Sequence, residues 1–127
     1  MNEDLRGKAI VVTGGTSGIG LAVVKKLATL GAFMIGVGRS EKRNQQAQRA
    51  MLAELGGSEL TAEKVHYLLA DLSLQSQVRD LGNKVIQKLN AFGYHYLDVL
   101  INNAGVYLEK KVMTQEGIEK TFAVNHL

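Results

Sequence analysis

The chain has 127 residues, of which 46% are hydrophobic and 21% are charged. These values are typical of a folded globular domain and exclude a disordered or fibrous protein. The net charge of +3 is small and the basic residues are scattered, which argues against nucleic-acid binding. Cysteine is absent, so disulfides and thiolate metal sites are excluded. Because no stretch reaches the roughly 20 apolar residues of a membrane span and no signal peptide begins the chain, we expect a cytoplasmic protein.

The first half of the chain alternates strand and helix patterns. A β-branched apolar run at residues 8–13 predicts a strand that is buried on both faces. Glycines follow it, and apolar residues at helical spacing then predict a helix over residues 21–30. A second strand is predicted at residues 32–37. Ser40 is the predicted N-cap of a polar helix that continues to about residue 55.

The third unit begins with a predicted strand at residues 65–70. Ser73 is a candidate N-cap for a helix that continues to about Asn90. Five apolar residues of this helix share one face by their spacing, which predicts that they point inward. They are Leu74, Val78, Leu81, Val85 and Leu89.

A fourth strand is predicted at residues 97–101, and Thr114 is a candidate cap for a helix over residues 116–127. Four strand–helix units of about 30 residues each predict an α/β fold, a doubly wound parallel sheet of the Rossmann type. The strand order 3-2-1-4 would leave the fourth strand at an open edge. Since six strands are usual, we expect residues 1–127 to be a dinucleotide-binding domain that is incomplete on its C-terminal side.

The turn after the first strand is rich in glycine and small polar residues. Its candidate phosphate-binding residues are Thr13, Gly14, Thr16, Ser17, Gly18, Ile19 and Gly20. Glycines there permit unusual backbone angles, and they let a pyrophosphate approach the main chain and the helix pack on the strand. The N–H groups and the dipole of the following helix favour phosphate. Simple turn formation and flavin phosphate binding are the alternatives, whereas the absence of a following Lys-Ser or Lys-Thr pair excludes a nucleoside-triphosphate P-loop.

The spacing Gly-x-x-x-Gly-x-Gly after a threonine resembles the short-chain dehydrogenase/reductase family, and further motifs follow in the same order. Asp71-Leu72 stands where the family's Asp contacts the adenine ring. Asn102-Asn103-Ala104-Gly105 matches the family's Asn-Asn-Ala-Gly segment. There Asn103 is expected to tie the fourth strand to the sheet, while Ala104 and Gly105 leave room for a cofactor ribose.

The end of the second strand indicates which nicotinamide cofactor is bound. NAD enzymes carry an acid about twenty residues after the glycine turn, whereas NADP enzymes carry an Arg near the 2′-phosphate. This chain has Arg39 and Ser40 there, followed by Lys42 and Arg43. A guanidinium and a hydroxyl can both bind phosphate, so we predict NADP(H) rather than NAD(H).

The resemblance implies hydride transfer to or from an alcohol or carbonyl substrate, with a Ser, a Tyr and a Lys four residues after the Tyr as catalytic residues. Asn125 corresponds to the family's fourth catalytic residue, which holds a water in a proton relay. Tyr107 and Lys111 have the Tyr-x-x-x-Lys spacing. They lie directly after the Asn-Asn-Ala-Gly segment, however, and are rejected as the catalytic pair. The run that contains Asn125 and His126, Val124-Asn125-His126-Leu127, is similar to the corresponding run of retinol-dehydrogenase-like members of the family.

The leading hypothesis is therefore the cofactor-binding part of an NADP-dependent oxidoreductase that is inactive by itself and whose full-length form is a homo-oligomer. One alternative is a non-catalytic dinucleotide-binding or sensing protein with this fold. Another is a short protein that completes its sheet by oligomerisation. The three histidines are too scattered to predict a metal site. The substrate itself is not predicted.

Overall fold

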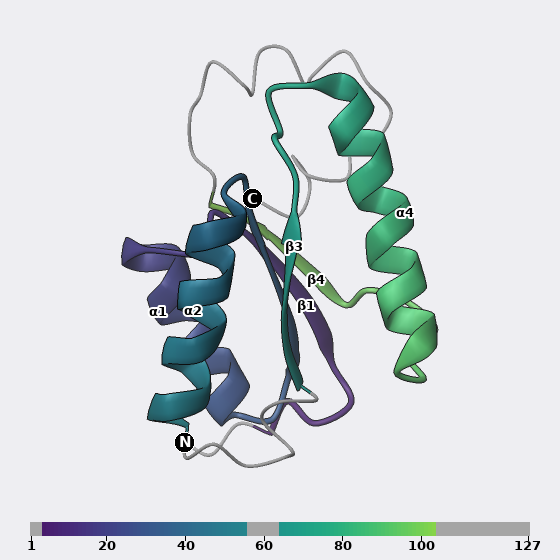
Figure 1. Ribbon diagram of the computed structural model, residues 1–127. Coiled ribbons are helices and arrows are strands. Elements are labelled where there is room, and N and C mark those ends of the chain that lie inside the picture. Colours follow the sequence, from purple (N-terminus) through teal and green to yellow (C-terminus); the bar gives the residue numbers. More distant parts are fainter. Residues whose placement is uncertain (1–3, 56–63, 104–127) are drawn as a thin grey trace.

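The computed structural model describes residues 4–55 and 64–103, in which strands and helices alternate (Figure 1). The strands are β1 (Ala9–Thr13), β2 (Phe33–Gly38), β3 (Val65–Leu69) and β4 (Val99–Asn102), and the helices are α1 (Gly18–Thr29), α2 (Glu41–Glu54) and α4 (Gln75–Ala91). These elements confirm the four predicted strands and the first three predicted helices, with small differences at their ends. The predicted helix at residues 116–127 lies outside the described residues.

The four strands form one parallel sheet with the order β3-β2-β1-β4, which confirms the predicted topology. Helices α1 and α2 cover one face of the sheet, and α4 covers the other face (Figure 1). Because all strands are parallel, their carboxyl ends meet at one edge, next to the start of α1. The α/β Rossmann-type fold is therefore present.

Alternation of side chains along the strands divides the core into two clusters. In β1, Val11 belongs to the cluster that packs against α4, whereas Ile10 and Val12 belong to the cluster under α1 and α2. Both clusters consist mainly of aliphatic side chains that are almost completely removed from solvent, and Phe33 belongs to the cluster under α4. The sheet is thus buried on both faces, as the continuous apolar runs predict.

The start of α4 differs from the prediction. Leu74, not Ser73, is the N-cap, and its side chain is 47% exposed rather than part of the core. The Ser73 hydroxyl donates instead to Asp71 Oδ1 at 2.6 Å, so it is engaged outside the helix. The other four residues of the predicted inner face, Val78, Leu81, Val85 and Leu89, are buried as expected.

The cap of α2 follows the prediction. The Ser40 hydroxyl oxygen accepts a hydrogen bond from the Arg43 N–H at 3.2 Å, and Leu55 is the C-cap. Ser40 therefore begins the helix whose first turn lies beside the carboxyl end of β2. Among the described residues, no helix has the length and apolar character needed to cross a membrane.

Candidate functional site

The glycine turn connects the carboxyl end of β1 to the start of α1. Gly14 and Gly18 have φ angles of +66° and +55°, a left-handed conformation that favours glycine. The N–H groups of Gly14 and Gly15 both donate to the Val37 carbonyl oxygen of β2, at 2.9 and 3.3 Å. Hydrogen bonds to the neighbouring strand therefore hold the first part of the turn against the sheet.

Residues at the end of β4 hold the same turn from the other side. The Asn103 N–H donates to Thr13 Oγ1 at 2.9 Å, and its side-chain amide donates to the Gly14 carbonyl oxygen at 3.3 Å. The Thr13 hydroxyl in turn donates to Asn102 Oδ1 at 2.9 Å. Thr13 is fully buried, so it links β1 to β4 rather than facing a ligand. The expected structural role of Asn103 in joining β4 to the centre of the sheet agrees with these contacts.

The start of α1 offers uncapped N–H groups. Ser17 is the N-cap, but its side chain makes no capping hydrogen bond with the helix. Ser17, Gly18 and Ile19 are exposed, with 76% of Ile19 accessible, whereas Gly20 is buried. A Cβ atom at Gly20 would overlap with the Gly14 carbonyl oxygen, so glycine is required for α1 to approach the turn. First-turn N–H groups without side-chain caps, at the positive end of the helix dipole, attract anions.

A hollow of about 540 Å³ lies beside the turn, at the carboxyl ends of β2 and β3. Its lining combines residues from three connections between strand and helix. They are Gly14, Thr16, Val37, Gly38, Arg39, Ser40, Arg43, Ala70, Asp71 and Leu72. The fold thus brings together residues that are far apart in the sequence, at the edge of a parallel sheet where ligands commonly bind.

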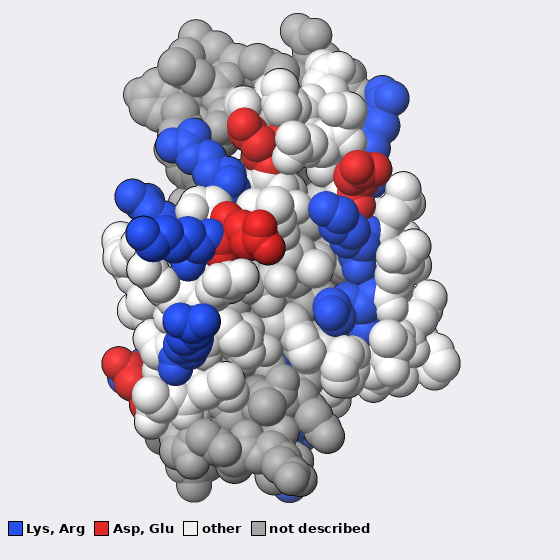
Figure 2. All heavy atoms as spheres, viewed as in Figure 1, with Lys and Arg blue, Asp and Glu red and all other residues white. Residues whose placement is uncertain are grey.

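Charge in this hollow is mainly basic. Arg39 and Arg43 are exposed, and Figure 2 shows several Lys and Arg side chains, with acidic side chains beside them, where α2 lies in this view. Asp71 is the acidic residue of the lining. Hydrogen bonds from the Ser73 side chain and N–H lower the pKa of Asp71 below its usual 3.8, and the positive charge of Arg39 lowers it further. Asp71 therefore remains ionised near neutral pH and can accept hydrogen bonds there.

Asn44 is a buried polar residue of α2, next to Gly38, that the sequence interpretation missed. Its amide nitrogen donates to the carbonyl oxygens of Gly38 and Leu68, at 3.3 and 3.2 Å, and so joins the ends of β2 and β3. Its Oδ1 atom is buried without a hydrogen-bond partner among the described residues. The otherwise polar helix α2 has one buried stripe, formed by Asn44, Ala47 and Met51. The presence of an amide side chain in this stripe is the sequence feature that could have predicted the role of Asn44.

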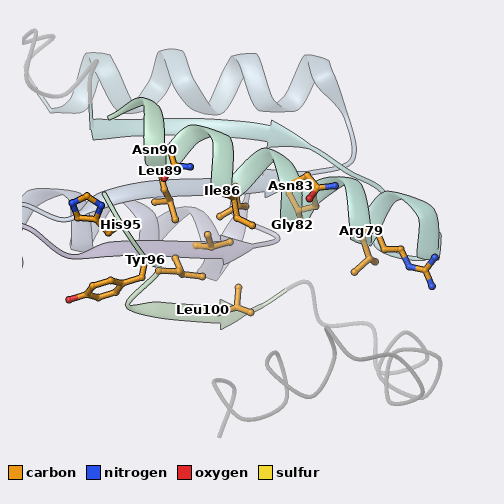
Figure 3. A pocket seen from close by; sticks show the side chains of 14 residues that line it. Arg79, Gly82, Asn83, Ile86, Leu89, Asn90, His95, Tyr96 and Leu100 are labelled. Carbon is orange, nitrogen blue, oxygen red and sulfur yellow. The ribbon is translucent and has the colours of Figure 1, made fainter. Parts of the chain in front are cut away.

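A second hollow, of about 520 Å³, lies on the opposite face of the sheet between α4 and β4 (Figure 3). Its walls are mostly apolar and include Ile86 and Leu89 from the helix and Leu100 from the strand. None of the predicted site residues lines it. The basic hollow beside the glycine turn is therefore the candidate functional site.

Comparison with known proteins agrees with this geometry. The family described as short chain dehydrogenase matches residues 8–127. The chain belongs to the short-chain dehydrogenase/reductase family. A short chain dehydrogenase/reductase from Colletotrichum higginsianum, dpchH, is 41% identical over 98% of this chain and 29% of that protein. Polyprenol dehydrogenase from Mus musculus is 35% identical over 95% of this chain and 33% of that protein.

Solved structures share the fold. The C-domain of a bacterial malonyl-CoA reductase, solved with NADP, superposes with a TM-score of 0.68 and 35% identity. That match covers 80% of this chain and 15% of that chain. The matched family is one of dehydrogenases. The chain spans about a third of the length of the two curated relatives.

The short-chain dehydrogenase/reductase motifs lie at different distances from the hollow. Six of the predicted cofactor-binding residues line it, namely Gly14, Thr16, Arg39, Ser40, Asp71 and Leu72. Ser17, Gly18 and Ile19 lie on the exposed start of α1, while Thr13, Gly20 and Asn103 support the turn. Ala104, Gly105 and Asn125 lie outside the described residues. Val37, Gly38 and Ala70 line the hollow but were not predicted as site residues.

Proposed function

We propose that this chain is the cofactor-binding part of an NADP-dependent short-chain oxidoreductase that acts on an alcohol or a carbonyl compound. The observation that carries the proposal is the position of Arg39 and Arg43 in a hollow that adjoins the uncapped start of α1. The two residues that follow β2, Arg39 and Ser40, include no acid. The malonyl-CoA reductase domain of the same fold was solved with NADP.

The residues present fit a dinucleotide phosphate. The N–H groups at the start of α1 would hold the diphosphate, where glycine leaves the main chain uncovered. Arg39, Ser40 and Arg43 would hold the 2′-phosphate, since guanidinium groups bind phosphate through paired hydrogen bonds. Asp71 and Leu72 would border the adenine. Every one of these groups except the α1 N–H groups belongs to the lining of one hollow.

NADPH supplies a hydride when it is bound, and the protein orients it and manages the proton. Asn125, by resemblance, would hold a water in the proton relay. The Tyr-x-x-x-Lys pair in this sequence, Tyr107 and Lys111, directly follows the Asn-Asn-Ala-Gly segment and is not proposed to act in catalysis. We therefore propose that the 127-residue chain binds the nucleotide without turning over substrate.

A binding experiment tests this proposal. Calorimetry on the 127-residue chain is expected to show that NADPH binds more tightly than NADH, and 2′,5′-ADP more tightly than 5′-AMP. Arg39→Asp should weaken NADPH binding by about 10- to 100-fold, because it replaces charge-assisted hydrogen bonds with repulsion, and should affect NADH much less. Arg49→Asp is the matched control, since Arg49 is exposed on α2 but does not line the hollow. Equal affinity for NADH and NADPH, unchanged by Arg39→Asp, would contradict the proposal.

A further inference from the structure

Tyr67 lies on β3, yet its side chain reaches across the neighbouring strand. Gly36 of β2 is its partner in the parallel register, and Val12 of β1 follows in the same row. Neighbouring strands are about 4.8 Å apart, so an aromatic side chain can extend over the next strand if the residue there is small. A Cβ atom at Gly36 would overlap with the Tyr67 ring. Glycine at position 36 therefore leaves the space over β2 that the ring occupies, on the face covered by α1 and α2.

The far end of this side chain contacts the glycine turn. The Tyr67 hydroxyl donates to the Gly15 carbonyl oxygen at 2.7 Å, a contact between residues 52 positions apart in the sequence. Gly15 is buried and lies against Gly36, because a Cβ atom at Gly15 would be 3.3 Å from the Gly36 Cα atom. Without the hydroxyl, a buried carbonyl oxygen would lose the hydrogen bond that the structure gives it, which is costly in an apolar setting.

Hydrogen bonds to residues of β2 and β3 and to the residue that follows β4 therefore fix Gly14 and Gly15, the first two glycines of the turn. Val37 accepts from both N–H groups, Asn103 donates to the Gly14 carbonyl oxygen, and Tyr67 donates to the Gly15 carbonyl oxygen. Of these hydrogen bonds, the one from Tyr67 is made to the Gly15 carbonyl group, which directly precedes Thr16 in the chain. Thr16 lines the candidate site and precedes the N-cap of α1.

Burial also defines how the Tyr67 hydroxyl can act. Removal of the phenol from solvent raises its pKa far above the usual value of 10. The group is therefore protonated at neutral pH, where it donates the hydrogen bond to Gly15.

We propose that Tyr67 is a positioning residue that, together with Gly36, sets the place of the glycine turn and so the direction of the N–H groups that receive the cofactor diphosphate. This inference rests on the proposed function for its ligand. The structural part of the inference, that Tyr67 holds the turn, does not depend on which ligand binds. The proposal assigns a binding role to a residue of β3 that does not itself line the hollow.

Tyr67→Phe on the 127-residue chain tests the proposal, because it removes the hydroxyl and keeps the ring over Gly36. Amide exchange followed by NMR is expected to become about tenfold faster at Gly14 and Gly15, whose N–H groups bond to Val37. NADPH binding should weaken by a similar factor, which corresponds to the loss of one hydrogen bond. The lost hydrogen bond should also lower the thermal midpoint, but the faster exchange should be concentrated in the turn.

Two controls separate positioning from general stability. Tyr94→Phe makes the same chemical change in a tyrosine that stacks on Phe33, with ring centroids 4.7 Å apart, and should alter neither readout. Val85→Ala removes core volume on the α4 face and should lower the thermal midpoint without specific loss of protection in the turn. If Tyr67→Phe left exchange and affinity unchanged, or if both followed the thermal midpoint as in Val85→Ala, the proposal would be overturned.

A second variant tests the same geometry by another route. Gly36→Ala retains the hydroxyl but forces the ring away from β2, because the added methyl group would overlap with it. It should reproduce the faster exchange at Gly14 and Gly15; unaltered exchange in this folded variant would oppose the proposal. Failure of the wild-type chain to bind NADPH would refute the proposed function, and the exchange measurement would still decide whether Tyr67 holds the turn.

Discussion

At the scale of single residues, the candidate site combines groups that face a ligand with groups that hold them in place. Asp71 illustrates both roles. Its Oδ1 accepts hydrogen bonds from the Ser73 N–H at 3.0 Å and the Ser73 hydroxyl at 2.6 Å, while the residue lines the hollow beside Arg39. Because the pKa of Asp71 is lowered in the folded state, ionised Asp71 contributes stability above the usual pKa of 3.8. That contribution is lost as the pH falls through the lowered value.

Ser73→Ala is expected to raise the pKa of Asp71 toward 3.8, because the variant lacks the hydroxyl whose hydrogen bond is the largest cause of the shift. Titration of the Asp71 carboxyl carbon by NMR measures this change directly. Acid unfolding below pH 3.8 should then depend less steeply on pH. Ser76→Ala, at an exposed position of α4, is the control and should leave the titration of Asp71 where it is. A titration of Asp71 that Ser73→Ala does not change would show that the hydroxyl is not the cause.

Residues of the site differ in how far the sequence alone could predict them. Gly14 and Gly18 follow from a local rule, because the turn requires left-handed backbone there. Asn44 and Tyr67 do not, since each acts through contacts with strands that are distant in the sequence. Their roles depend on the register between β2 and β3, which no spacing within the chain reveals.

At the scale of elements, local chemistry determined where helices begin only when no competing partner was near. Ser40 caps α2 as predicted, because its hydroxyl oxygen has the Arg43 N–H within reach. Ser73 does not cap α4, because Asp71 engages it first and the helix then begins after Leu74. The apolar spacing predicted that Leu74 points inward. An N-cap residue does not have helical backbone angles, however, so the helical spacing does not describe the direction of its side chain.

Leu74→Ser is expected to stabilise the protein by about 0.5–2 kcal/mol, since it adds a capping oxygen where the backbone already has extended angles. Urea unfolding measures the change. Leu74→Ala is the matched control, because it removes the exposed leucine without supplying an acceptor. Equal effects of the serine and alanine variants would show that capping is not the source of the gain.

At the scale of the whole molecule, the sheet separates two cores that share no side chain. Leu81 and Ile35 belong to the cluster under α4, whereas Ile10 belongs to the cluster under α1 and α2. The alternating faces of β1 and β2 make this division predictable in principle. The burial of the sheet and the order of its strands were predicted from the sequence. The assignment of individual strand residues to the two faces was not.

Stability effects of substitutions on the two faces should therefore be additive. Ile10→Val is expected to cost about 0.5–1.5 kcal/mol and Leu81→Ala about 2–5 kcal/mol. The double variant should equal their sum within roughly 0.5 kcal/mol, as measured by urea unfolding. The pair Ile35→Val and Leu81→Ala lies within one cluster and should depart from additivity. Strong coupling across the sheet would contradict the division into two cores.

The position of the Tyr67 ring over Gly36 also constrains how this part of the fold can evolve. A side chain at position 36 and an aromatic ring lying over it cannot occupy the same space, because even a methyl group there would overlap with the ring. A path that acquires the glycine before the tyrosine, or that loses the tyrosine first, avoids an intermediate chain in which the ring is displaced from β2. The two positions are therefore expected to change together among descendants of this sequence.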